Sequence, residues 1–437
     1  MNQKIFPVLF LFFAATASAQ HYHSLQEVIA TAVENNYAIR LARNNQRISE
    51  NNYSLGNAGF LPVIDLRGQY SGTRTNTDRT DFDGVGSSLR NIHNTVGSAN
   101  LSLGWTIFDG FRVQYNYDKL EVLKEMGELS TEVALENLVA AITAEYFNLV
   151  QQQRLLDNLR FAVELSRERV RIDEERFLLG SGSKLQLLQA EVFLNADSSR
   201  MGRQEEVVRA SRVRLNELMA MENLRYNIRP ADTVISINEI MIYETLERSA
   251  LSRNTRLRAA AKNKRIVEYD HKLTISQAYP YVNLSSGYGY TYNTFQTGTF
   301  SDQQSFGMNY GITVGMNIFD GFNRRRQISN AAINKENSRI VYEDVHLSVM
   351  SDLITIYNEY LNNFRLLDLE TQNLDVAYET LNIAMERYRL GALSGFELRE
   401  VQKNLLEAEE RLLSIQYNTK LAEISLLRLA GRVLEYL

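Results

Sequence analysis

The sequence predicts a mainly α-helical protein with a small membrane β-barrel portion, built from two tandem repeats. The pentapeptide IFDGF occurs at 107–111 and again at 318–322, and the same 211-residue offset relates the later segments ERFLLGSGSKLQL and ERYRLGALSGFEL. Four segments alternate apolar and polar residues, and long stretches without proline carry an apolar residue at every seventh position. Because so long an internal repeat outweighs a domain count based on length, we expect two halves of one fold, residues 20–230 and 231–437.

Residues 1–19 have the pattern of a secretory signal peptide. Lys4 is the sole charged residue there, an apolar run follows at 5–15, and the small residues Ala-Ser-Ala occupy 17–19. The run is too short to span a bilayer as a helix. The chain has no cysteine, which excludes disulfides, thiolate metal sites and a lipid-modified N-terminal cysteine. We expect an exported protein without a lipid anchor, and its formal net charge of −5 argues against nucleic-acid binding.

After an initial helix, each repeat is expected to contain a β-hairpin. Apolar side chains occupy every second position of the alternating segments, and the opposite face carries mainly small polar residues. The expected strands are residues 62–73 and 96–108 in the first repeat, and 280–293 and 308–319 in the second. Upstream of Ala99 the offset between the repeats rises from 211 to 218 residues. Since loops tolerate length changes, we expect a loop between Tyr70 and Ala99.

These strands have the properties of membrane-spanning strands. Each has the ~9–11 residues that a tilted strand needs to cross a bilayer, and three of the four polar faces are small and uncharged. Aromatic residues on the apolar faces are candidate anchors at the membrane interface, namely Tyr70, Trp105, Tyr288, Tyr290, Tyr292 and Tyr310. An ordinary sheet packed on a core is the competing interpretation of any single strand.

Four strands are too few to close a barrel. An open sheet edge in lipid would leave backbone donors and acceptors unsatisfied, so a barrel has to be shared by several chains. The alternation by itself permits a dimer with eight strands as well as a larger assembly.

Long helices are predicted after each hairpin, at residues 112–179 and 323–390. Their seven-residue apolar period is typical of helices that supercoil around neighbours. At ~1.5 Å per residue, each of these helices extends roughly 100 Å. The period continues in shorter return helices at 183–221 and 394–431, so each repeat is expected to contain a long antiparallel helical hairpin.

The turn of each helical hairpin falls at residues 180–183 and 391–394. Glycine suits a left-handed helix end and serine suits the N-cap of the returning helix, so a purely structural role competes with a binding role. Arg, Gly, Ser and Leu recur at matched positions in both turns. This recurrence favours exposed tips that bind another molecule.

Taken together, the signal peptide, the duplicated order of elements, the FDG sequence after the second strand and the R-x-x-x-G-x-x-S tips resemble the TolC-like outer membrane efflux proteins. The resemblance covers essentially the whole chain after residue 19. It implies a homotrimer whose twelve strands form one outer-membrane barrel on a helical tunnel through the periplasm. It also implies a passive exit duct for efflux or type I secretion, docked to a periplasmic adaptor protein and an inner-membrane pump.

By position, the resemblance implies adaptor contacts in both tips. The residues are Arg176, Gly180, Ser183, Leu187 and Leu188 in the first tip, and Arg387, Gly391, Ser394 and Leu398 in the second. It further implies that Glu397 and Glu400 form a carboxylate ring at the narrow end, which would favour cations and help to gate the tunnel. A solvated helix face is the competing interpretation, and Arg399 is placed to neutralise part of the charge of Glu400.

Two other classes of protein compete with a channel. For an enzyme, the five histidines show no H-E-x-x-H or other metal-ligand spacing, and no glycine loop with nucleotide-binding spacing follows a strand. We therefore expect no catalysis, no cofactor and no metal site. A structural coiled-coil protein of the cell envelope would account for the seven-residue period but not for the four amphipathic strands.

Overall fold

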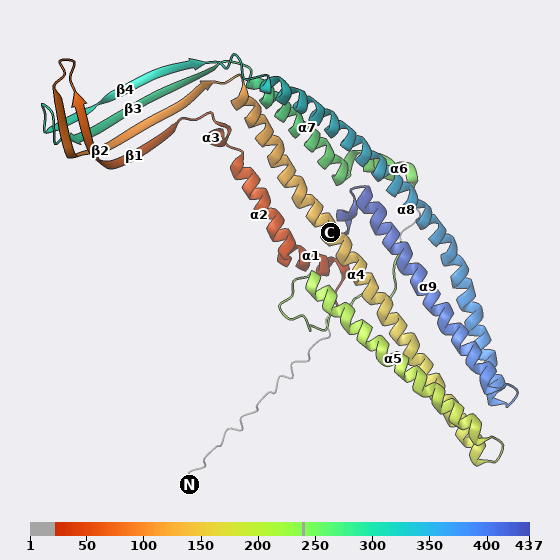
Figure 1. The fold of residues 1–437 in the computed structure, drawn as a ribbon. Coiled ribbons are helices and arrows are strands. Elements are labelled where there is room, and N and C mark those ends of the chain that lie inside the picture. Colours follow the sequence, from red (N-terminus) through yellow and green to blue (C-terminus); the bar gives the residue numbers. More distant parts are fainter. Residues whose placement is uncertain (1–21, 238–240) are drawn as a thin grey trace, which may run out of the picture.

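A computed structural model describes residues 22–237 and 241–437 (Figure 1). The expected signal peptide, residues 1–19, lies outside the described residues. The molecule is elongated, with a β-sheet at one end and two helical hairpins whose tips lie at the other (Figure 1). Shorter helices pack around the long helices between these ends.

Each repeat opens with helices that precede the β-hairpin. In both repeats, an asparagine at the junction between two of these helices contacts the end of the return helix. The helices are α1 (Leu25–Asn35), α2 (Tyr37–Asn52) and α3 (Leu55–Ala58) in the first repeat, and α6 (Tyr243–Arg253) and α7 (Thr255–Ser276) in the second. Asn36 caps the N-terminus of α2, and its side-chain amide donates to the Leu218 carbonyl at 2.9 Å. Asn254 caps α7 and donates to the Leu429 carbonyl, also at 2.9 Å. Equivalent asparagine side chains thus connect equivalent helices in the two repeats.

The helical hairpins have equal dimensions. The long helices α4 (Arg112–Leu178) and α8 (Asn323–Arg389) each contain 67 residues, and the return helices α5 (Lys184–Leu218) and α9 (Gly395–Leu429) each contain 35. One stretch of α4 is long and apolar enough to cross a membrane, but 56% of it is buried inside the protein. The central part of α4 is therefore the core helix against which α1, α5 and α9 pack.

Within the described residues, four strands form one antiparallel sheet in the order β1-β2-β3-β4. The strands are β1 (Val63–Thr80), β2 (Gly86–Phe108), β3 (Tyr281–Thr294) and β4 (Asp302–Gly315). The pairing of β2 with β3 joins the two repeats, with Gly97 opposite Tyr292. The mainly helical fold with a small strand portion is the class that the sequence predicts.

The first β-hairpin extends beyond the expected ranges 62–73 and 96–108. Most of the expected loop between Tyr70 and Ala99 is paired strand, and the connection at its end covers only residues 81–85. These outer parts of β1 and β2 are mainly polar, with Leu89 and Ile92 as the apolar exceptions, so apolar alternation did not reveal them. A register shift lies between Thr75 and Thr77, and opposite it Asn91 has a φ of +55°.

The expected strand 308–319 is displaced in the structure. It begins at Asp302 and ends at Gly315, because Gly315 lies opposite Tyr281, the first residue of β3. Residues 316–319 keep the apolar alternation but have no partner strand there. Alternation therefore indicated the face of the strand correctly and its end wrongly.

The repeated FDG sequence forms the turn from strand to long helix. Gly110 and Phe111 both have left-handed conformations, with φ of +70° and +66°, and the Asp109 carboxylate accepts from the Val113 amide at 3.2 Å. A Cβ on Gly110 would lie 2.5 Å from the Ser276 carbonyl, so a larger residue does not fit. The second copy repeats this geometry at Gly321 and Phe322, with φ of +68° and +65°.

Candidate functional site at the helical tips

Both helical hairpins turn through the same local structure. Gly180 and Gly391 end the long helices with φ of +77° and +78°. Ser183 and Ser394 then cap the return helices, each accepting at 3.2 Å from a backbone amide three residues later. Left-handed glycine and a serine N-cap are the usual ends of helices, so the recurrence of these residues has a structural cause.

Exposed apolar side chains surround these turns. They are Leu178, Leu179, Leu185 and Leu188 at the first tip, and Leu390 and Phe396 at the second. Leu187 is half-buried, whereas Leu398 is 0% exposed and packs among the core residues between α8 and α9. The expectation that Leu398 contacts an adaptor therefore does not fit this structure, because its side chain is inaccessible.

The two candidate gate residues are exposed but differ in their contacts. The Glu397 carboxylate accepts from the Ser394 amide at 3.0 Å and from its hydroxyl at 2.7 Å, and these bonds lower the pKa of Glu397. Glu400 lies 4.0 Å from the Lys403 ammonium. The expected neutralisation of Glu400 by Arg399 is wrong, since Arg399 forms an ion pair with a residue of the other hairpin.

That residue is Asp197 of α5, which is 1% exposed. Arg399 of α9 donates to both Asp197 carboxylate oxygens, at 2.6 and 2.8 Å, and the Ser166 hydroxyl donates to the same carboxylate at 2.6 Å. The Arg399 guanidinium also lies 5.1 Å from the centre of the Phe193 ring. A bidentate pair of this kind is strong and directional, so it fixes the second hairpin against the first.

A second connection lies closer to the turns. The Tyr388 hydroxyl of α8 donates to the Asp173 carboxylate of α4, and the Arg176 guanidinium donates to the Tyr388 carbonyl and stacks 4.8 Å from its ring centre. Burial and the bond to Asp173 raise the pKa of Tyr388 to about 12, so the phenol remains a donor at physiological pH. In this structure Arg176, which is expected to contact an adaptor, links the two hairpins.

An open cavity of about 720 Å³ lies between the tips, and this network forms one wall of it. Arg169 is 3% exposed and lies 3.8 Å from Asp173, and in the described part of the chain its Nε and Nη1 atoms have no hydrogen-bond partner. A buried guanidinium with free donors makes the network incomplete. The junction between the hairpins therefore combines these polar contacts with an apolar cluster, in which Ile172 of α4 packs against residues of α8 and α9.

Sequence reasoning did not identify Asp173, Asp197 or Tyr388 as candidates, and it assigned Arg399 to a different partner. One signal was present, because at the 211-residue offset their counterparts are all apolar, namely Ala384, Ala408, Phe177 and Leu188. A polar residue at a position where the other repeat is apolar indicates a contact that the two copies do not share.

The model of the family described as outer membrane efflux protein matches residues 28–220 and 246–432. The chain belongs to this family. Among curated relatives, the cation efflux system protein CusC of Escherichia coli K12 is 25% identical over 401 residues, which cover 85% of this chain and 82% of CusC.

Solved outer-membrane channels share the fold of this efflux protein. The Campylobacter jejuni CmeC channel superposes with a TM-score of 0.77 at 18% identity, covering 93% of this chain and 85% of CmeC. The open state of the Neisseria gonorrhoeae MtrE channel gives a TM-score of 0.73 at 16% identity, covering 93% and 88%. The family and these neighbours are efflux channels rather than enzymes.

The candidate interface aromatics of this efflux protein are exposed at several heights on the sheet. Tyr70 and Tyr292 lie in one row, on either side of Gly97. Trp105 lies eight residues further along β2, and its indole donates to the Phe60 carbonyl at 2.8 Å. At 3.3 Å per residue these levels are roughly 26 Å apart, close to the height of the apolar band of membrane barrels. Tyr288, Tyr290 and Tyr310 lie between the two levels.

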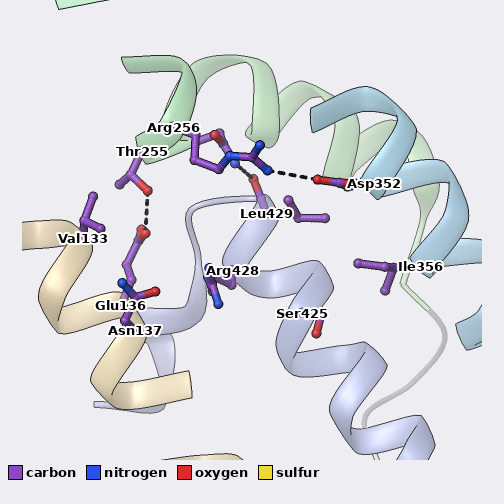
Figure 2. A pocket seen from close by; sticks show the side chains of 11 residues that line it. Val133, Glu136, Asn137, Thr255, Arg256, Asp352, Ile356, Ser425, Arg428 and Leu429 are labelled. Carbon is purple, nitrogen blue, oxygen red and sulfur yellow. Dashed lines mark hydrogen bonds and ion pairs between the residues drawn. The ribbon is translucent and has the colours of Figure 1, made fainter. Parts of the chain in front are cut away.

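A second cavity of the efflux protein, of about 250 Å³, lies where α4, α7, α8 and α9 meet (Figure 2). Two pairs of its polar side chains are hydrogen-bonded: Thr255 donates to Glu136 at 2.7 Å and Arg256 to Asp352 at 2.9 Å (Figure 2). Burial raises the pKa of Glu136. Because these polar groups already have partners, we interpret this cavity as part of the packing between the repeats.

Proposed function

We propose that this chain is the exit duct of a tripartite efflux system and that it acts as a homotrimer. The observation that carries the proposal is the sheet, in which β1 and β4 each have a neighbour on one side only among the described residues. An open edge is not stable in lipid, so β4 of one copy would pair with β1 of the next. Three copies would close a barrel of twelve strands.

In this arrangement the sheet lies in the outer membrane and the helical hairpins extend into the periplasm. The aromatic levels at Trp105 and at Tyr70 would mark the two membrane interfaces. Rods of 67 residues from several copies would surround a tunnel of roughly 100 Å, long enough to carry substrate far from the membrane.

The mass of the detergent-extracted complex, measured by light scattering and corrected for bound detergent, tests this proposal. A mass of three chains supports the shared barrel. A mass of two chains would indicate the eight-stranded alternative, and a stable monomer would leave the sheet edges open and favour an envelope coiled-coil protein.

The tips would dock to a periplasmic adaptor that connects the duct to an inner-membrane pump. The surface for this contact consists of the exposed turns at Gly180, Ser183, Gly391 and Ser394 with the exposed leucines beside them, including Leu188. Exposed apolar side chains gathered at one end of a molecule are typical of a protein interface. Leu398 is excluded because it is buried.

Crosslinking tests the docking surface directly. The chain contains no cysteine, so Ser183→Cys and Ser394→Cys each introduce a single reactive site. We expect both variants to crosslink to the adaptor in cells, whereas Ser88→Cys, at the far end of β2, does not. Equal crosslinking from all three positions, or none from either tip, would contradict the docking surface.

We also propose that Glu397 and Glu400 of the assembled copies form a carboxylate ring at the narrow end. Such a ring would favour cations over anions and bind divalent cations in the pore. Replacing both residues by glutamine should reduce cation preference and divalent block of single-channel conductance. Unchanged values would exclude the ring.

A further inference from the structure

A third cavity contains a concentration of arginines that the duct function does not use. Its volume is about 520 Å³, and it lies between α4, α5 and the segment that follows α5. Four arginines line it: Arg154 and Arg160 from α4, Arg212 from α5, and Arg229 from the following segment. Tyr22 also lines it.

The side chains that line this cavity carry more positive than negative formal charge. Two aspartates line it beside the four arginines, which leaves a formal net charge of +2. Asp157 is paired with Arg160 at 2.9 Å. Asp232 accepts from the Tyr146 hydroxyl at 2.7 Å. Both carboxylates therefore already have partners.

Arg212 has a hydrogen-bond donor that is not used. Its Nε atom is shielded from solvent and has no hydrogen-bond partner in the described part of the chain. Burial and the charges of Arg229 and Arg160 lower the pKa of Arg212. Arginine nevertheless remains protonated in proteins, so a partly buried positive charge persists beside two others of the same sign. Such a charge is unfavourable unless an anion accompanies it.

We propose that this cavity binds an oxyanion, a phosphate or carboxylate group, held by the guanidinium groups around Arg212. Guanidinium groups present planar pairs of N–H donors that match the oxygens of both anions. The volume exceeds that of inorganic phosphate and lies within the range of small-molecule pockets, so the anionic group can belong to a small organic molecule. This site is independent of the tips and of the membrane sheet.

Calorimetric titration of the detergent-extracted complex at constant ionic strength tests the site, with inorganic phosphate and citrate as separate probes. The two probes distinguish a phosphate site from a carboxylate site. We expect at least one to bind and Arg212→Gln to weaken that binding about tenfold or more, since a charged hydrogen-bond donor is lost. Arg203→Gln is the matched control, because Arg203 is an exposed arginine of the same helix that does not line this cavity.

Other outcomes would overturn the proposal. These are the absence of binding by either probe at millimolar concentration, and equal weakening by Arg212→Gln and Arg203→Gln, which would indicate a general effect of charge. Binding to dissociated chains but not to the complex would show that a second copy fills the cavity. If Arg212→Gln does not fold, Arg160→Gln provides the test, because it leaves Arg212 in place and should also weaken binding.

Discussion

The α4–α5 and α8–α9 hairpins match in length, in their left-handed glycine turns and in their serine caps, yet the side chains that face one another differ in kind. In the contacts of Asp173 with Tyr388 and of Asp197 with Arg399, the first hairpin supplies the acceptor and the second supplies the donor. Asp173 and Asp197 of the first correspond to Ala384 and Ala408, and Tyr388 and Arg399 of the second correspond to Phe177 and Leu188.

This difference shows how a duplicated fold can acquire contacts between its halves. Identical copies would present like groups to one another, whereas an acid on one copy and a base on the other attract. Changes at four side chains supply these contacts without altering the turn backbone, whose glycine φ angles agree within 1°. The polar contacts between the hairpins can therefore be removed one residue at a time.

The largest effect is expected for Asp197→Ala, which gives the first hairpin the residue found in the second. Arg399 would remain mostly buried without a partner, at a cost of about 3–5 kcal/mol. We expect the amides near the tips, at the N-terminal ends of α5 and α9, to lose a corresponding amount of protection against hydrogen exchange in the intact complex.

The double variant Asp197→Ala with Arg399→Leu is the control for that prediction. Each substitution introduces the residue found at the equivalent position of the other repeat, Ala408 for Asp197 and Leu188 for Arg399. Because both charges are removed, most of the lost protection should return. If the double variant is as unprotected as the single one, the pair is not what holds the hairpins together.

Tyr388→Phe should have the next largest effect, because it makes the second tip resemble the first at Phe177. Losing a hydrogen bond to a carboxylate costs about 1.5–3 kcal/mol. We expect faster exchange at the end of α8 and, if the hairpins separate, a higher single-channel conductance. Phe177→Tyr adds the same hydroxyl at an exposed position and should change neither quantity.

This bond should also depend on pH in the alkaline range. The pKa of Tyr388 rises from its ordinary value of 10.0 to about 12, so its contribution to stability is complete below pH 10 and is lost as the pH rises through 12. Conductance of the wild type should then increase above pH 10, and Tyr388→Phe should remove that part of the increase. An identical alkaline response in both proteins would exclude Tyr388 as its source.

Gly180→Ala and Gly391→Ala should each cost about 1 kcal/mol, since both glycines are left-handed and neither has a close neighbour. Equal losses of exchange protection at the two tips would confirm that the turns are equivalent and that only the facing side chains differ. Gly202→Ala, inside α5 with open space around it, should instead be neutral or stabilising. Clearly unequal losses at the tips would contradict the comparison.

The smallest effect is expected for Glu397→Gln, because Gln186 forms the same capping box in the first tip. The pKa of Glu397 is lowered in the folded protein, so its contribution is present above the ordinary value of 4.5 and is lost as the pH falls through the lowered value. Exchange at the second tip, corrected for intrinsic rates, should increase at acidic pH in the wild type but not in Glu397→Gln. A persistent acid response in the variant would assign it to another group.

The sequence identifies most clearly the elements that depend on residues close together in the chain. A seven-residue period and a glycine turn depend on neighbours within a few positions, and the long helix begins at Arg112, where the sequence indicates. The end of β4 depends on where β3 begins, and the partner of Arg399 depends on how two hairpins lie together. Adjacent residues of a helix do not face each other, which is why Arg399 does not neutralise Glu400.

The order of strands in the sheet has a consequence for biogenesis. β2 pairs on one side with β1, which is close in sequence, and on the other with β3, whose residue Tyr292 lies opposite Gly97. Contacts between residues that are far apart in the sequence form late in folding. Until then the edge of β2 is unpaired, and an unpaired strand edge is prone to aggregate. During synthesis, the first hairpin is therefore complete well before β3, its second neighbour, has been made. A chaperone that covers this edge until residues 281–294 arrive would keep the chain competent to fold.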